Sequence, residues 1–158
     1  MNAIEREQFD LLKMTLALRS DLFAALTDSD LTFQPPGDAL TLGAVLKVMG
    51  EVQHAYTESF RTFRLTFAYQ HADDRVAHSI DALRAWFEQL DAALMAALRA
   101  LSDEDISTKQ IDRGGWSMPP MIQFHTFREA LLIEYGKIDV YLRMLAKTRG
   151  EQWQAWIG

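Results

Sequence analysis

The sequence contains no cysteine and only four histidines among its 158 residues. The absence of cysteine excludes disulfide frameworks, thiolate zinc sites, CxxC redox motifs and cysteine nucleophiles. Any transition-metal site must therefore be built from carboxylates and from His54, His71, His78 and His125.

Basic residues and long apolar runs are also scarce. The 16 Lys and Arg residues are outnumbered by 22 Asp and Glu residues, which gives a net charge of −6. This charge opposes binding to phosphate backbones, so nucleic acid is not an expected partner. No apolar run approaches the roughly 18 residues that a membrane-spanning helix needs, and residues 1–7 do not resemble the start of a signal peptide. We expect a cytoplasmic protein with no membrane partner.

The sequence does contain four segments in which apolar residues recur every three or four positions. This spacing predicts helices over about 3–27, 42–68, 75–101 and 119–148. Turn-forming residues predict long loops at 28–41, which contains Pro35 and Pro36, and at 102–118, which contains Gly114 and Gly115. No segment shows a convincing strand pattern. We therefore predict one all-α domain over 1–158, a four-helix bundle with long loops between helices 1 and 2 and between helices 3 and 4.

The fourth predicted helix has two apolar faces. Most of its large apolar residues share one face, and Ile133, Val140 and Met144 lie nearly opposite. A helix that is apolar on two sides needs two neighbours. The second neighbour is either the tail, residues 151–158 with Trp153 and Trp156, or the same helix of a second copy. We expect a homodimer through this helix.

Two helical pairs have spacings that metal sites use. Glu51 and His54 have the Glu-x-x-His spacing of two-metal bundles, but the chain has no second such pair and both residues lie far from the apolar stripe. His125 and Glu129 are four residues apart, on one side of a helix that also points away from the apolar face. We expect solvated surface positions, with metal ligation by these residues as the lesser alternative.

Glu134 lies on the flank of the apolar face of the fourth helix. An ionised carboxylate is costly there unless it is paired or partly hydrated. We expect a salt bridge from Glu134 to a neighbouring helix, with proton transfer or metal coordination as the alternative.

Two short blocks carry a family resemblance. The first is FQPPG at 33–37 followed by TLGAVL at 41–46, and the second is EYGKI at 134–138 followed by YLRML at 141–145. The second block is similar to the His-x-Gly-Gln-Ile and Tyr-Leu-Arg signature of the DinB/YfiT-like superfamily of bacterial four-helix bundles. The resemblance covers nearly the whole chain in helix order. It implies a DinB-like bundle, a divalent metal such as zinc or nickel, and activities such as thiol-dependent transfer or isomerisation.

The chain departs from the family at the metal site. The positions of the three family histidines fall on Val48, Ala130 and Glu134, and Lys137 replaces the usual Gln. Valine and alanine have no lone pair to give to a metal. His54 lies six positions after Val48 and His125 lies five positions before Ala130, so neither histidine can take the missing place by a small shift of register. The resemblance therefore implies a family fold without its usual metal, and we predict no cofactor.

Three functions remain open at this point. The first is a metal-free DinB-like protein that binds a small molecule or a protein partner in or beside the altered metal cleft. The second is a thiol-dependent S-transferase or isomerase with a rearranged site that involves Glu134. The third is a dimeric interaction module with no ligand.

Overall fold

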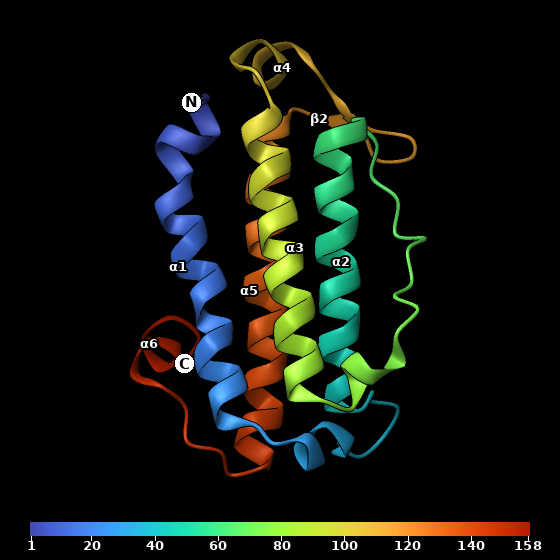
Figure 1. Cartoon of the computed structure of the whole chain (residues 1–158), viewed down its shortest axis with the longest axis vertical. Helices are drawn as coiled ribbons and strands as arrows, with labels where there is room; N and C mark the ends of the chain where they lie inside the picture. The colour runs from blue at the N-terminus through green and yellow to red at the C-terminus, as the bar shows by residue number, and fades with distance from the viewer.

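The computed structural model describes all residues from 1 to 158 and contains four long helices side by side (Figure 1). They are α1 (Ala3–Ala25), α2 (Leu42–Thr62), α3 (Ile80–Ala100) and α5 (Pro120–Met144). Three begin at a polar cap, because the side chains of Asn2, Thr41 and Ser79 each accept a hydrogen bond from an otherwise unpaired amide of the first turn. The predicted all-α bundle of four long helices is confirmed.

The two central helices run in the same direction. Figure 1 shows α2 and α3 rising together, while α1 descends at the left and α5 descends behind α3. Because parallel neighbours cannot be joined by a short turn, residues 63–79 must travel back along the whole length of α2 before α3 begins (Figure 1). We call residues 64–73 the return segment.

The return segment corrects the predicted ends of two helices. The sequence predicted helices over 42–68 and 75–101, but α2 ends at Thr62, and α3 begins at Ile80 after a short 3-10 helix, η2 (Asp74–Ala77). Phe63 has a left-handed backbone with φ of 56°, which stops α2. A third long loop therefore joins α2 to α3.

The other connections contain short elements that the sequence did not predict. The 3-10 helix η1 (Asp28–Thr32) lies between α1 and α2, and α4 (Asp103–Thr108) follows α3. Strands β1 (Ile111–Asp112) and β2 (Ser117–Met118) pair as a small antiparallel hairpin. The start of the return segment joins this hairpin, because the Leu65 amide donates to the Asp112 carbonyl and the Asp112 amide donates to the Phe63 carbonyl. The top of the bundle is thus closed by backbone hydrogen bonds.

The largely apolar bundle interior contains a charged cluster that joins three helices. Arg19 on α1 is only 3% exposed, forms an ion pair with Asp91 on α3 and donates a 2.7 Å hydrogen bond to Gln53 on α2. Gln53 in turn donates to Asp91 over 2.7 Å. This polar cluster links α1, α2 and α3 and fixes their positions relative to one another along the bundle axis.

The tail folds back as α6 (Glu151–Trp156). Trp153 is buried against Tyr135, and its indole nitrogen donates a 2.9 Å hydrogen bond to Asp139. Trp156 stays 39% exposed. One tryptophan of the tail therefore packs back onto the bundle. None of the helices has the length and hydropathy required to cross a membrane.

Candidate functional site

A groove between α2 and α5 brings together two of the three residues singled out by the sequence. Val48 from α2 and Glu134 from α5 line the same cavity, whose volume is about 330 Å³. Its remaining walls come from Leu40, Val45, Lys137 and Tyr141. The Tyr141 hydroxyl donates a 2.8 Å hydrogen bond to the Leu40 carbonyl, which fixes the chain entering α2 against α5. We call this cavity the α2/α5 groove.

The polar edge of the groove is an ion pair within one helix. Lys137 Nζ lies 2.6 Å from Glu134 Oε1, and the two residues are three positions apart on α5. The predicted salt bridge from Glu134 to a neighbouring helix is therefore wrong, because a lysine one turn away on the same helix reaches the carboxylate first. Burial raises the pKa of the Tyr141 phenol, so its hydroxyl stays a proton donor to Leu40. The groove is an apolar trough with one ion pair at its rim.

Glu51 and His54 lie under the return segment. Glu51 accepts a 2.8 Å hydrogen bond from the His71 amide, and the His54 ring stacks on Tyr69 with 3.7 Å between ring centroids. The expectation of a solvated outer face is wrong at these positions, because the extended chain covers that side of α2. Both side chains hold the return segment in place.

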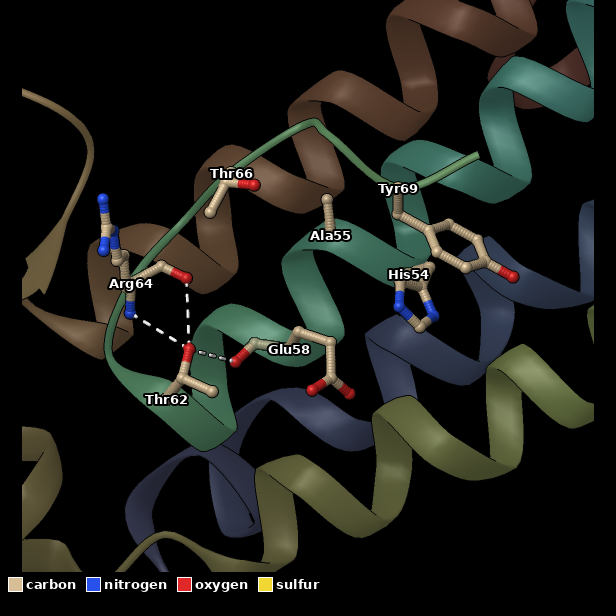
Figure 2. Close-up of a pocket in the computed structure, with 7 residues that line it drawn as sticks. All are labelled: His54, Ala55, Glu58, Thr62, Arg64, Thr66 and Tyr69. Carbon is tan, nitrogen blue, oxygen red and sulfur yellow. Dashed lines mark hydrogen bonds between the residues drawn. The ribbon is translucent and has the colours of Figure 1, made fainter. Parts of the chain in front are cut away.

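A second hollow lies beside these contacts. Figure 2 shows the return segment passing along α2 with the side chains that line the hollow between them. The volume of this open cavity is about 420 Å³. It is lined by His54, Ala55, Glu58, Thr62, Arg64, Thr66 and Tyr69. Glu58 is already paired with Arg61 at 2.5 Å, whereas the Arg64 guanidinium has no carboxylate partner within 4.0 Å. The sequence does not predict this hollow, because its apolar spacing predicts a helix as far as residue 68, whereas α2 ends at Thr62.

His125 and Glu129 lie on the outer side of α5. His125 is half-buried and its ring packs edge-on against Phe124 with 5.5 Å between centroids, whereas Glu129 is exposed. Nowhere in the structure do three His, Asp or Glu side chains gather as metal ligands. The pair is a surface feature of α5.

The comparisons with known proteins agree with this architecture. Residues 11–133 match the sequence pattern of the DinB superfamily. The chain belongs to the DinB superfamily. A crystal structure of a DinB-like protein from Bacillus cereus ATCC 10987 superimposes with a TM-score of 0.75 and 19% identity, over 90% of this chain and 93% of that one. No curated protein matches the sequence.

A second DinB-like protein, from Bacillus subtilis, superimposes with a TM-score of 0.68 and 13% identity, over 89% of this chain and 94% of that one. At these identities the two crystal structures support the fold alone.

The groove of this DinB-superfamily protein does not fit the metal that the resemblance implies. Val48 and Ala130 present only methyl and methine groups, so Glu134 is the one possible ligand among the three positions. Lys137 already occupies one oxygen of that carboxylate. A structural or catalytic zinc site uses at least three protein ligands. These residues cannot supply them.

Proposed function

We propose that this DinB-superfamily protein binds a small amphipathic molecule in the α2/α5 groove, independently of a three-histidine metal centre. The observation that supports the proposal is the shared groove of Val48 and Glu134. Two positions at which the resemblance expects ligands still line one cavity of about 330 Å³. The cavity is present in this chain although Val48 cannot bind a metal.

The walls define the chemistry of the ligand. Leu40 and Val48 are 52% and 41% exposed, so an apolar body resting on them would be removed from water. Glu134 and Lys137 offer one acceptor and one donor at the rim, where they would orient a polar end that carries an amine or a carboxylate. An apolar trough with a few directing polar groups is the usual form of a small-molecule site.

Fragment screening by amide NMR tests the proposal. Apolar fragments with a terminal amine or carboxylate should shift the amides of Leu40, Val48 and Tyr141 in the wild-type protein. Val48→Trp should fill the groove and abolish these shifts without disturbing the core, because Val48 points into the groove and not into the bundle. Ile133→Trp, on the exposed outer face of α5, is the matched control and should leave binding unchanged.

Fragments that shift other amides, or that bind Val48→Trp as well as the wild type, would show that the groove is not the ligand site.

An isologous dimer through α5 is a second candidate property. Ile133, Val140 and Met144 are 61%, 53% and 49% exposed, and Trp153 of the tail packs beside Asp139, away from them. A stripe of this kind is self-complementary across a two-fold axis. Sedimentation should give a mass that rises with concentration, and Val140→Glu should return the monomer.

Met14→Glu, which alters a similarly exposed apolar residue on α1, should leave this association intact. A mass that stays at one chain over the whole concentration range would eliminate the dimer.

The residues of the α2/α5 groove support thiol transfer less well than they support ligand binding. Glu134 is the only carboxylate in the groove, and it is held in an ion pair. An assay with several low-molecular-weight thiols separates the two functions. Turnover that disappears in Glu134→Gln would replace the binding proposal with an enzymatic one.

A further inference from the structure

The unpaired cations of this protein are unevenly distributed. Eleven of the 16 Lys and Arg side chains form ion pairs with carboxylates. The five that do not are Arg64, Arg84, Lys109, Arg113 and Arg128. Three of these, Arg64, Lys109 and Arg113, lie at the end of the bundle that carries the hairpin.

Backbone pairing brings these three residues together. Arg64 forms a parallel bridge with Asp112, so the start of the return segment lies directly beside β1. Arg113 is the next residue along the hairpin, and Lys109 Nζ lies 5.7 Å from the centre of the Phe63 ring. The carboxylates nearby have other hydrogen-bond or ion-pair partners: Asp112 accepts a 2.8 Å hydrogen bond from the Gly114 amide, and Glu58 is paired with Arg61. Asp105 caps α4 by accepting from Ser102, and the charge of Lys109 contributes to lowering its pKa.

The two most exposed aromatic side chains of the protein lie at the same end. Trp116 in the hairpin is 57% exposed and Phe67 in the return segment is 59% exposed. The Arg113 guanidinium lies 4.8 Å from the Trp116 ring centre and 5.8 Å from that of Tyr56. Phe67 packs against the same buried Tyr56 ring with 6.1 Å between ring centroids. Tyr56 therefore lies beneath both Phe67 and Arg113 and links them from the interior.

We infer that this surface, formed by Arg64, Phe67, Lys109, Arg113 and Trp116, docks an acidic peptide segment of a partner protein. It is called the hairpin-end surface below. Aromatic and arginine side chains are the groups that most often anchor protein interfaces. An apolar residue of the peptide packs on Trp116 and Phe67, and its carboxylates meet the free cations. The hollow beside Arg64 (Figure 2) receives a further side chain.

Charge favours a peptide over a nucleic acid at this surface. The chain as a whole carries a net charge of −6, which repels a continuous phosphate backbone. An acidic peptide presents carboxylates one at a time and can place each beside a single cation, clear of Asp112 and Glu58. The hairpin-end surface shares no residue with the α2/α5 groove, so the two proposals stand or fall separately.

Selection of a phage-displayed library of random dodecapeptides on the full-length protein tests this inference. The enriched peptides should combine Asp or Glu with Trp, Phe or Leu. Fluorescence anisotropy with the strongest enriched peptide should show a loss of affinity of about tenfold or more in Trp116→Ala and in the double variant Arg64→Gln, Lys109→Gln. Arg113 is left in place because it also donates to Gln123 inside the bundle.

Two variants at the opposite end of the bundle provide matched controls. Trp156→Ala removes another exposed tryptophan and Arg84→Gln removes another unpaired cation, and both should bind the peptide normally. Thermal unfolding establishes that all four variants fold. The inference is overturned if no peptide is enriched, if the enriched peptides are not acidic, or if Trp116→Ala binds like the wild type. It is also overturned if a single-stranded oligonucleotide binds more tightly and is lost in the same variants.

Discussion

Arg19 and Asp91 differ sharply in burial although they form one ion pair. The Arg19 side chain is 3% exposed, whereas that of Asp91 is 32% exposed. Removing one partner leaves the other charge uncompensated, and the cost depends on how much water can reach it. Asp91→Leu should therefore cost about 3 kcal/mol or more of unfolding free energy. Arg19→Leu should cost less, because water reaches Asp91. Urea unfolding of both variants measures the difference, and an equal or reversed order would contradict it.

Asp139 makes the docking of the tail dependent on pH. Burial alone would raise the pKa of this carboxyl, but hydrogen bonds from Arg143, Trp153 and Arg149 outweigh burial and lower it. A carboxyl whose pKa is lower in the folded state stabilises the fold above its unfolded pKa of about 3.9. That stabilisation is lost as the pH falls from about 4 through the lower folded pKa.

Trp153 fluorescence should report this loss as release of the indole on acidification. Asp139→Asn should be less stable at neutral pH and should show a flatter decline in unfolding free energy below pH of about 5. If the variant declines as steeply as the wild type, other carboxyls control the acid transition.

At the scale of elements, the packing of α2 on α3 depends on a glycine. A Cβ added at Gly50 would lie 2.4 Å from two ring carbons of Trp86, and that ring stacks on His71 of the return segment at 4.2 Å. Alanine in a helix usually adds up to about 1 kcal/mol of stability relative to glycine. Here Gly50→Ala should instead cost about 1–3 kcal/mol, because Trp86 must move.

Gly136 on α5 provides the comparison, since nothing lies within 4 Å of its added Cβ. Gly136→Ala should raise the urea midpoint while Gly50→Ala lowers it. A higher urea midpoint in both variants would contradict this prediction, because it would mean that Trp86 can move without a loss of unfolding free energy.

The extended conformation of the return segment could not be predicted from the sequence. From Phe63 to Tyr69 apolar residues occupy every second position, which is the pattern of an extended chain. Because Phe60 and Phe63 also continue the helical spacing of α2, the sequence predicts a helix that runs past Thr62. The start of α2 after Thr41 could be predicted because capping is a local interaction. The end of α2 could not, because it is fixed by hydrogen bonds to Asp112, about fifty residues further along the chain.

At the scale of the whole molecule, the four long helices were predictable, whereas the contacts of the tail were not. The resemblance implies one site for Val48, Ala130 and Glu134; Val48 and Glu134 line the α2/α5 groove, and Ala130 does not. No pattern in the sequence indicated that Asp139 would accept hydrogen bonds from Arg149 and Trp153, since this depends on how α6 folds back. Helical periodicity identifies the apolar faces of each helix, but which element packs on each face depends on the tertiary structure.

The tail and the groove lie on different sides of α5, so stability and binding should be separable. Trp153 is 1% exposed and packs on Tyr135, whereas the groove lies on the side that faces α2. Trp153→Ala should cost about 3–5 kcal/mol, the usual loss for a buried tryptophan, and Trp156→Ala should cost far less because Trp156 is 39% exposed. Fragments should still bind Trp153→Ala with wild-type affinity at temperatures at which it is folded. Weaker fragment binding in Trp153→Ala would show instead that α6 sets the position of α5 and therefore the width of the groove.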